Sequence, residues 1–325
     1  MRATDAFTIE VRLGPHELGD ALRADVVKGL TASPKELPPK WFYDERGCEL
    51  FDEITGLPEY YPTRRETEIL RREATRIARV TRAHELIELG SGSSEKTRIL
   101  LDALTACGTL ERYVPLDVAE AYLRAAGESI AARYSLRVHG VVGDFEHHLD
   151  DLPDGERRII AFLGGTIGNL YPDQRARFYR QIARQMHDGD YFLLGTDLVK
   201  SRERLEAAYN DSAGVTAAFN LNMLRVLNDR LDADFDVRAF EHRAFFDPDR
   251  SWIEMRLRSL HAQTARVRAV KLEVTFAEGE EMRTEISTKF TRARVRAELA
   301  EAGLKLATWW TDAAGDYALS LSVRA

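Results

Sequence analysis

The sequence has few cysteines and no long apolar segment. Only Cys48 and Cys107 occur among 325 residues, and no C-x-x-C spacing connects them, which argues against a disulfide framework and against a structural zinc site. No apolar run approaches the roughly 20 residues that a membrane span needs. The opening MRATDAFTIEVRLG lacks the apolar core of a signal peptide. We therefore expect a cytoplasmic protein that does not bind membranes.

An excess of positive charge is also missing. The chain carries 46 Lys and Arg against 53 Asp and Glu, for a net charge of −7, and its arginines are interleaved with acids, as in RLEAAYNDSAG. A strongly nucleic-acid-binding protein would show a basic stripe or patch instead. We expect no nucleic-acid partner, and we expect a monomer that acts on a small molecule.

Motifs for nucleophilic or metal-based chemistry are absent as well. The chain has no G-x-S-x-G elbow and no P-loop, and neither cysteine lies in a recognisable nucleophile motif. His147 and His148 are adjacent, so they point in different directions on any regular element and are interpreted as surface residues rather than as metal ligands. No metal is expected, and the chemistry should belong to an organic cofactor.

What the sequence does contain, from about residue 64, is an alternation of helical and strand-like segments. The predicted helices are RRETEILRREATRIARV, AEAYLRAAGESIAARY and QRARFYRQIARQM, and the predicted strands are ELIELG, RYVPLDV, RVHGVVGDF, RRIIAFLGGT and DYFLLGTDL. Short apolar strands separated by helices predict a parallel sheet covered on both faces. LKLATWWTD and YALSLSVRA are expected to add an antiparallel hairpin, which completes a seven-stranded α/β sheet.

Two regions interrupt this alternation. Residues 1–63 contain the proline-rich SPKELPPKWFYDERGCELFDEITGLPEYYPT, and residues 200–289 begin with helices and then become β-rich. Because the sheet pattern resumes at 290, the second region is interpreted as an insertion between the fifth and sixth strands. We expect residues 1–63 and 200–289 to form a smaller α+β substrate-binding domain over the carboxyl ends of the strands, where open α/β sheets bind ligands. Residues 64–199 and 290–325 are expected to form the sheet domain.

A glycine turn follows the first of these strands. The strand-like Leu86 to Leu89 is followed by Gly90 and Gly92, and Ser93 to Leu101 is predicted to form a helix that opens with hydroxyl residues. A strand, a glycine turn and a helix start present backbone N–H groups and the positive end of a helix dipole. Glu95 stands where the dinucleotide fingerprint has its third glycine, so a tight βα connection without a ligand is the alternative interpretation.

Lys96 is predicted to lie in the first turn of that helix. A cation disfavours the positive end of the dipole, so it should have an anionic partner. The partner is either a ligand carboxylate or one of the neighbouring acids Glu95 and Asp102.

Acidic residues end the next two strands. Asp117 follows about one βα unit after the glycine turn, where an acid can accept hydrogen bonds from ribose hydroxyls. Asp144 and Phe145 end the third strand, and an acid beside an aromatic ring suits the amino group and the face of an adenine. Taken singly, Asp117 can be a helix cap, and Phe145 can be a core residue beside a capping Asp144. Together with the glycine turn, they indicate an adenosine-containing cofactor.

The fourth strand ends in LGGTIGNL, in which two glycines allow a close approach of the backbone to a ligand. Asn169 follows on a predicted exposed loop, where its amide can orient an amine or a carboxylate. The alternative for Asn169 is an Asx-turn.

Beyond these single residues, long strings of the chain resemble a known family. The sheet pattern, ELGSGSSEKT and Asp117 resemble a Rossmann-like class I methyltransferase that uses S-adenosylmethionine (SAM). LPPKWFYDERGCELFDEITGLPEYYPTR, LGGTIGNL, LLGTDLVK, AAYNDSAGVTAAFN and EGEEMRTEISTKF resemble, more narrowly, the histidine-specific Nα-methyltransferases of ergothioneine biosynthesis. The similarity spans nearly the whole chain, including the inserted region.

The resemblance implies a set of site residues. For SAM, the methyl donor, it implies Gly90, Lys96, Asp117, Asp144 and Phe145. For the substrate L-histidine it implies Tyr60, Asn169, Tyr209, Glu285 and Ser287, with Tyr43 near the amino group and Met255 lining the side-chain pocket; Tyr43 and Asn169 are the implied catalytic pair.

The activity implied by the resemblance is trimethylation of the α-amino group of histidine, which gives hercynine. Two alternatives stay open at this point: a methyltransferase of the same build that acts on another amino acid or small amine, and a non-catalytic SAM-binding regulator.

Overall fold

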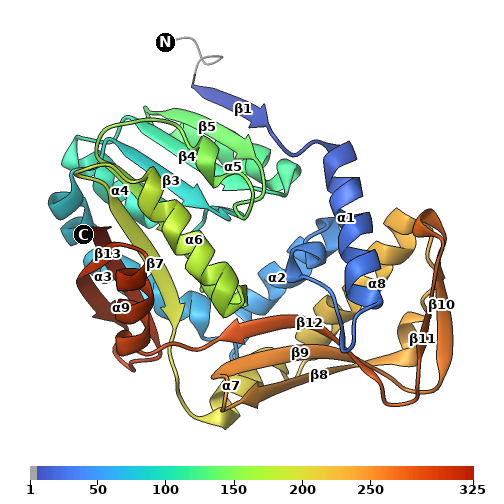
Figure 1. Cartoon of the computed structure of the whole chain (residues 1–325). Helices are drawn as coiled ribbons and strands as arrows, with labels where there is room; N and C mark the ends of the chain where they lie inside the picture. Colours follow the sequence, from blue (N-terminus) through green and yellow to red (C-terminus); the bar gives the residue numbers. More distant parts are fainter. Residues whose placement is uncertain (1–5) are drawn as a thin grey trace. The chain divides into compact units, whose positions relative to one another are not determined.

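The computed structural model describes residues 6–325, which form two compact units. Unit 1 comprises the described residues up to Gly14 together with Pro62–Val199 and Phe290–Ala325, and unit 2 comprises Pro15–Tyr61 and Lys200–Lys289. Figure 1 shows the elements of both units in sequence colours. In the part of the chain that the structure describes, no helix is long and apolar enough to cross a membrane.

Unit 1 is built on an eight-stranded sheet with the order β1-β5-β4-β3-β6-β7-β14-β13. Six strands are parallel to their neighbours, and β14 is antiparallel to both β7 and β13. The strands are β1 (Phe7–Val11), β3 (Glu85–Leu89), β4 (Arg112–Asp117), β5 (Arg137–Val142), β6 (Arg158–Phe162), β7 (Tyr191–Asp197), β13 (Leu304–Thr311) and β14 (Tyr317–Arg324). All seven predicted strands are present, including the C-terminal hairpin.

The eighth strand, β1, corrects the predicted domain boundary. Residues 1–63 were expected to belong entirely to the substrate-binding domain, and the first five lie outside the described residues. Phe7–Val11 instead pair in parallel with β5 at the edge of the unit 1 sheet. Three of the five residues of FTIEV are exposed and the other two are half-buried, because the strand lies at an edge, so the segment lacks the continuous apolar run of the central strands.

Helices cover both faces of this sheet, as the alternation of its residues requires. Alternate strand residues such as Leu86, Tyr113 and Ile159 pack with α3 (Pro62–Thr81), α4 (Thr97–Cys107) and α5 (Glu120–Arg133) in one apolar cluster. Their neighbours Ile87, Val114 and Ile160 pack with α6 (Pro172–Gln185) and α9 (Arg292–Glu301) in a second cluster. The predicted doubly covered parallel sheet is therefore confirmed.

One predicted helix start is wrong. The helix after the glycine turn begins at Thr97, with Lys96 as its N-cap residue, rather than at Ser93. Ser94 has a φ of +55°, in the left-handed region that a helix cannot contain. The turn is consequently longer than predicted, and Lys96 lies at the helix entrance.

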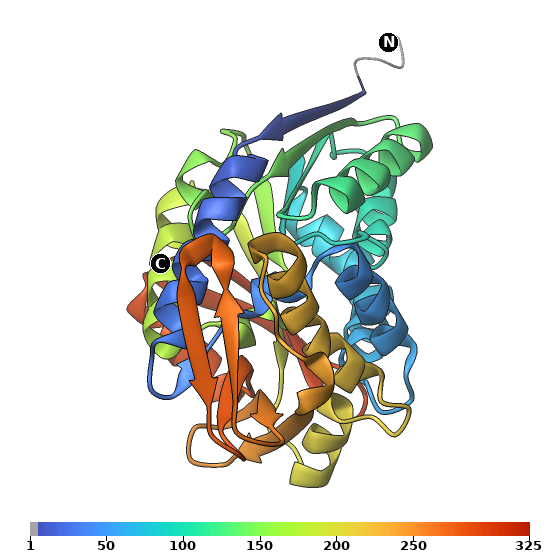
Figure 2. The ribbon, with the colours of Figure 1, turned by 90° about the vertical axis from the view of Figure 1, so that its right-hand side faces the viewer.

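Unit 2 contains a four-stranded sheet with the order β2-β12-β9-β8 and a separate hairpin. The sheet strands are β2 (Lys35–Glu36), β8 (Phe240–Asp247), β9 (Trp252–Ser259) and β12 (Glu281–Thr288), and the hairpin strands are β10 (Gln263–Val267) and β11 (Leu272–Phe276). The helices are α1 (Pro15–Leu30), α2 (Glu45–Gly56), α7 (Arg202–Tyr209) and α8 (Val215–Leu231). Figure 2 shows α1 and α8 beside the hairpin, and apolar residues of the four helices, of the hairpin and of β8, β9 and β12 form one core.

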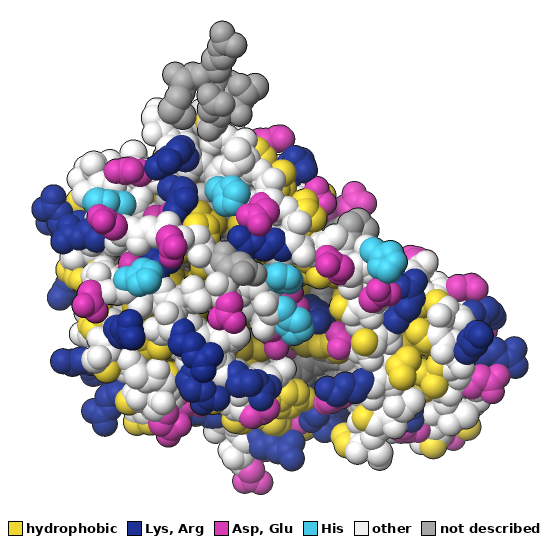
Figure 3. All heavy atoms as spheres, turned by 45° about the horizontal axis from the view of Figure 1, so that its top comes forward, with side chains coloured by type: hydrophobic (Ala, Val, Ile, Leu, Met, Phe, Trp, Pro, Cys, Tyr) yellow, Lys and Arg dark blue, Asp and Glu magenta, His cyan; other side chains and the backbone are white. Residues whose placement is uncertain are grey.

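Charged side chains of both signs are mixed over the surface face drawn in Figure 3. This distribution agrees with the interleaved acids and bases of the sequence and with its net charge of −7.

Candidate active site

The glycine turn of unit 1 lies at the carboxyl edge of the sheet, directly after β3. Gly90 and Gly92 have φ angles of +66° and +51°, which favour glycine, and an added Cβ at Gly92 would meet no atom within 4 Å. The corresponding Cβ at Gly90 would lie 4.0 Å from the ring of Phe145. The backbone at Gly90 and Gly92 therefore carries no side chain that would keep a ligand away.

Asp117 connects this turn to the end of β4. One carboxylate oxygen accepts from Gly92 N at 2.8 Å and the other from Ala119 N at 2.9 Å. Each oxygen keeps a second lone pair, so the carboxylate can still accept from a vicinal diol. The N-cap residue of α5 is Ala119, so Asp117 does more than cap that helix. Burial raises the pKa of Asp117, and the backbone N–H donors oppose that rise.

Asp144 and Phe145 follow β5 at the same edge. Asp144 is 7% exposed and accepts from Glu146 N at 2.8 Å, which fixes its carboxylate in an Asx-turn. The half-buried ring of Phe145 packs edge-on against Phe162 and near Gly90. The glycine turn, Asp117, Asp144 and Phe145 therefore lie together, and this arrangement fits an adenosine.

Lys96 has an anionic partner that the sequence did not indicate. Its ammonium forms an ion pair with Glu66 of α3, a fully buried carboxylate that also accepts from Gly164 N at 3.0 Å and from Tyr317 Oη at 2.9 Å. Neither Glu95 nor Asp102 is the partner. Lys96 remains 24% exposed, and no other bond to it is formed by the described residues, so two N–H donors are left for a ligand carboxylate.

A second buried carboxylate, Glu88, lies on β3 just before the turn. Thr97 Oγ1 and Tyr113 Oη each donate to it at 2.5 Å, and Tyr113 also bonds to Ser94 at 2.9 Å. Burial raises the pKa of Glu88 to about 7, against the effect of these two donors. Glu88 thereby ties the strand to the turn and to the start of α4.

Glu88→Gln is expected to remove part of the pH dependence of stability. Because the pKa rises from 4.5 to about 7 on folding, the stabilisation by the proton is complete below about 4.5 and is lost as the pH rises to about 7. The loss is on the order of 3 kcal/mol for such a shift. Urea unfolding at pH 5 and pH 8 should show a smaller difference for the variant than for the wild type. An equal difference in both proteins would show that Glu88 does not titrate in this range.

Asn169 ends the 3₁₀ turn η4 (Thr166–Asn169) after β6. Gly164 and Gly165, with φ angles of +77° and +74°, turn the chain there. The Asn169 side chain is half-buried, and the described residues offer its amide no hydrogen bond, so the alternative of an Asx-turn is not formed. Its donors and acceptor are available to a ligand.

In unit 2, aromatic side chains gather between η2 (Pro39–Phe42), α2, α7 and α8. Tyr60 is 8% exposed and meets Tyr209 edge-on at 6.5 Å between ring centroids. Tyr43 contacts Phe51 and Phe219, both at 5.6 Å. The three predicted tyrosines therefore belong to one aromatic cluster.

A β-bulge places Glu285 on the inner face of the unit 2 sheet. Arg283 pairs with Arg256 of β9, whereas Glu285 pairs with Met255, so Thr284 is the extra residue. A bulge turns the following side chain toward the opposite face. Thr284 is fixed there, since its hydroxyl donates to Asn220 Oδ1 at 2.7 Å and to the Met255 carbonyl at 3.1 Å.

Glu285 and Met255 are consequently neighbours on one buried face. Met255 is 1% and Glu285 9% exposed, and no described residue hydrogen-bonds to the Glu285 carboxylate. Burial raises the pKa of Glu285 to about 7, while the Lys289 ammonium acts in the opposite direction. A buried carboxyl without a protein donor is costly unless a ligand supplies one.

Ser287, two residues on, belongs to a cluster with Tyr209 and Lys289. Ser287 Oγ and Tyr209 Oη are 2.7 Å apart, and Lys289 Nζ donates to each at 2.9 Å. All three are under 9% exposed, and Lys289 is fully buried. Glu285 and Ser287 therefore lie on a buried face rather than at a solvent-exposed strand edge, and they share it with Lys289, a residue that the resemblance did not imply.

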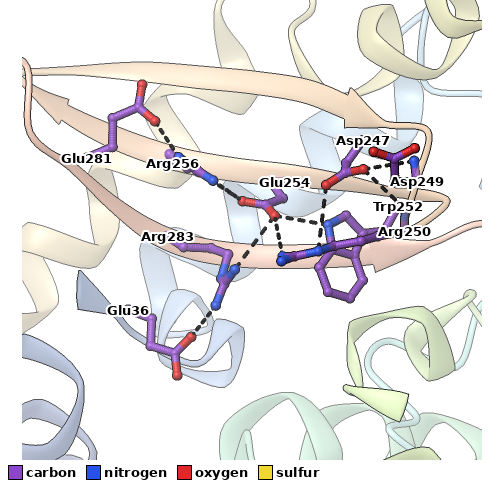
Figure 4. Close-up of polar contacts among 9 residues, drawn as sticks. All are labelled: Glu36, Asp247, Asp249, Arg250, Trp252, Glu254, Arg256, Glu281 and Arg283. Atoms are coloured by element: carbon purple, nitrogen blue, oxygen red, sulfur yellow. Dashed lines mark hydrogen bonds and ion pairs between the residues drawn. The ribbon is translucent and has the colours of Figure 1, made fainter. Parts of the chain in front are cut away.

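The outer face of β9 and β12 is different in character, as Figure 4 shows. There the buried Glu254 accepts from Trp252 Nε1 at 3.0 Å and from Arg256 Nη2 at 2.6 Å, and Arg283 Nη1 lies 3.6 Å away. Charges on this face are paired with one another, whereas Glu285 on the inner face has no such hydrogen-bonded partner.

Asn220 and His242 stabilise the position of Tyr209. Asn220 Nδ2 donates to His242 Nδ1 at 2.8 Å, so His242 Nε2 carries the hydrogen and donates to the Tyr209 carbonyl at 2.9 Å. Burial lowers the pKa of His242, which keeps the ring neutral. Neither residue was indicated by the sequence.

Comparison with known proteins agrees with these features. The family model described as "Histidine-specific methyltransferase, SAM-dependent" matches residues 22–324. The chain belongs to this family. The methyltransferase is 55% identical to a histidine N-alpha-methyltransferase of Mycolicibacterium smegmatis, over 96% of this chain and 98% of that protein. It is also 55% identical to its counterpart in Mycobacterium tuberculosis, over 94% and 95% of the two chains.

A more distant relative of this methyltransferase is ergothioneine biosynthesis protein 1 of Neurospora crassa, at 32% identity over 68% of this chain and 28% of that protein. The resemblance noted in the sequence is thereby confirmed, as are the class I methyltransferase fold and the use of SAM. The assignments of single residues to SAM and to histidine stay predictions.

Proposed function

We propose that this methyltransferase transfers three methyl groups from SAM to the α-amino group of L-histidine, giving hercynine in the first step of ergothioneine biosynthesis. Family membership supports the reaction class and the substrate. The observation that carries the choice of histidine is Glu285, a buried carboxyl beside Met255 and Ser287 to which no described residue donates. Such a group suits the N–H of an imidazole.

The residues at the carboxyl edge of the unit 1 sheet would hold the methyl donor. Asp117 would accept from the ribose hydroxyls, Asp144 and Phe145 would take the adenine, and Lys96 would bind the methionine carboxylate beside the bare turn at Gly90. When bound, SAM supplies an activated methyl group and a neutral thioether leaving group.

The residues proposed for histidine would orient the amine and let it gain methyl groups. Asn169 and Tyr209 would bind the α-carboxylate and so fix the α-carbon. Tyr43 and Tyr60 would present aromatic surface and hydroxyls to the amine, and such surroundings tolerate both a hydrated amine and a growing quaternary cation. Most of the acceleration would come from holding the neutral amine in line with the bond that breaks.

Mass spectrometry of histidine incubated with SAM and the enzyme tests the function. Gains of one, two and three methyl groups on histidine are the expected result. Unchanged histidine beside methylated tryptophan or tyrosine would assign the enzyme another amine substrate. No methylation of any amino acid, with SAM bound, would indicate a regulator.

Asn169→Ala tests the head-group assignment. Because its amide has no partner among the described residues, the substitution should lower kcat/KM for histidine by roughly ten- to a hundredfold, the loss of hydrogen bonds to a charged group. SAM affinity and thermal stability should stay near wild type. An equal loss of SAM affinity would place Asn169 in the cofactor pocket instead.

Two further expectations from the sequence belong to this proposal. We propose that the enzyme acts as a monomer in the cytoplasm and needs neither a membrane nor a nucleic acid. Sedimentation at micromolar concentration tests the monomer.

A further inference from the structure

Lys289 is the most buried cation near the proposed histidine residues of unit 2. It is fully buried at the end of β12, and its ammonium donates to Tyr209 Oη and Ser287 Oγ at 2.9 Å each. The ammonium also lies 4.5 Å from the centroid of the Tyr209 ring. With the 2.7 Å contact between the two hydroxyls, these atoms form a closed triangle.

This triangle limits what the hydroxyls can do. An ammonium only donates, so Tyr209 and Ser287 both accept from Lys289. One hydroxyl hydrogen lies between the two oxygens. Lys289 therefore constrains both the positions and the hydrogen-bonding roles of two hydroxyls that are proposed to bind histidine.

Lys289 also provides positive charge on the face that carries Glu285. Glu285, four residues earlier, is 9% exposed and lies on the inner side of the bulge. We infer that Lys289 is a positioning residue for histidine, which holds the Tyr209 and Ser287 hydroxyls and favours the ionised form of Glu285, the form that accepts best from the imidazole N–H. This inference rests on the proposed function.

The charge environment of Glu285 supports that role. Its pKa is raised by burial, and Lys289 is the charged group that lowers it. Charged residues on neighbouring elements lie elsewhere: Arg283, Arg256 and Glu254 belong to the outer face. The other titratable groups toward the inner side are Tyr209 at the end of α7, His242 on β8, Asp211 before α8, and Tyr43, Asp44 and Tyr60 in the segment around α2.

Two substitutions separate the charge of Lys289 from its geometry. Lys289→Met removes the ammonium but keeps most of the side-chain volume, and Lys289→Arg keeps a charge on a differently shaped donor. Lys35→Met is the control, because Lys35 also belongs to unit 2 but lies on β2 and pairs with Glu280, which directly precedes β12 at the end opposite Lys289. Each full-length protein is assayed for histidine methylation across pH and for SAM binding by calorimetry.

For Lys289→Met we expect KM for histidine to rise roughly ten- to a hundredfold, with a smaller change in kcat and unchanged SAM affinity. The acid limb of kcat/KM should move to higher pH by about one unit, because the ion that lowers the Glu285 pKa is gone. A merely structural role would lower the melting temperature without moving this limb.

For Lys289→Arg we expect a raised KM with an acid limb close to wild type, and for Lys35→Met no change in either. A Lys289→Met enzyme with the wild-type KM and limb would overturn the inference, as would an Arg variant whose limb matches that of the Met variant. If Lys289→Met does not fold, a wild-type KM in Lys289→Arg overturns it. The wild-type enzyme is assayed first. If it does not methylate histidine, the proposed function is wrong. The role of Lys289 is tested separately, by the differences between wild type and the variants.

Discussion

Glu285→Ala should lower kcat/KM for histidine by about a hundredfold and shift the preference between histidine and tryptophan toward tryptophan. A buried carboxylate that accepts from an imidazole N–H is a hydrogen bond to a charged group, worth roughly 1.5–3 kcal/mol. Its removal leaves an apolar space beside Met255 on the buried face of the sheet. A site that hydrogen-bonds one group of its substrate discriminates against ligands without that group. Removing the Glu285 carboxylate should therefore weaken the discrimination against tryptophan.

Glu281→Ala is the matched control for this substitution. Glu281 is on the same strand, but it lies before the bulge and pairs with Arg256 at 2.7 Å on the outer face. The measurement is kcat/KM for both amino acids with wild type and both variants. If the ratio for Glu285→Ala equals that for Glu281→Ala, Glu285 does not recognise the imidazole.

The raised pKa of Glu285 gives the same residue a pH signature. Since the pKa is about 7, the carboxyl is largely protonated below that pH, and its neutral carbonyl oxygen is a weaker acceptor for the imidazole N–H than the carboxylate is. Histidine turnover should therefore fall as the pH drops through 7, and Glu285→Gln, which cannot ionise, should lose that component of the profile. A profile unchanged in Glu285→Gln would assign the acid limb to the substrate alone.

The regular parts of the fold could be predicted because burial leaves a period in the sequence. ELIEL and RIIAF are buried on both faces in a parallel sheet, so their apolar runs were readable. FTIEV was missed because an edge strand buries less and has no such run. The predicted start of α4 was wrong because Ser94 adopts a left-handed backbone conformation, which the sequence usually indicates by a glycine and here does not.

The site residues at strand ends were predictable for a topological reason. Parallel strands bring their carboxyl ends to one edge, so Asp117 and Asp144 had to lie near the glycine turn. Glu66 was missed because its partners are Gly164 and Tyr317, far away in sequence. The available signal was a glutamate in the apolar stripe of α3, three residues before Ile69, since an unpaired charge is rarely buried.

The bulge at Thr284 shows a different limit. The alternation of strand residues puts Glu285 and Ser287 on one face, as observed, but it would also put Arg283 there. Because Thr284 is an extra residue, Arg283 lies on the face opposite Glu285. The bulge is held by the hydrogen bond from Thr284 to Asn220 of α8, a long-range contact that leaves no local pattern in the sequence.

The second large effect is expected at Asp117. Asp117→Ala removes the proposed acceptor for the ribose hydroxyls and also frees Gly92 N and Ala119 N, which the carboxylate now holds at 2.8 and 2.9 Å. Loss of a charged acceptor is worth roughly 2–3 kcal/mol, so the SAM dissociation constant should rise about thirty- to over a hundredfold.

Asp117→Asn distinguishes the two roles of this carboxylate. The amide keeps one oxygen for a backbone N–H but offers the ribose a weaker, neutral acceptor, so its SAM affinity should fall between those of wild type and Asp117→Ala. Glu111→Ala, which removes a 64% exposed acid of unit 1, controls for net charge. Calorimetry with SAM and thermal unfolding without ligand are measured for all four proteins. If Asp117→Ala binds SAM as tightly as wild type, Asp117 has a purely structural role in the turn. If the loss of SAM affinity is the same in Asp117→Ala and Asp117→Asn, the negative charge, rather than the anchoring of Gly92, accounts for binding.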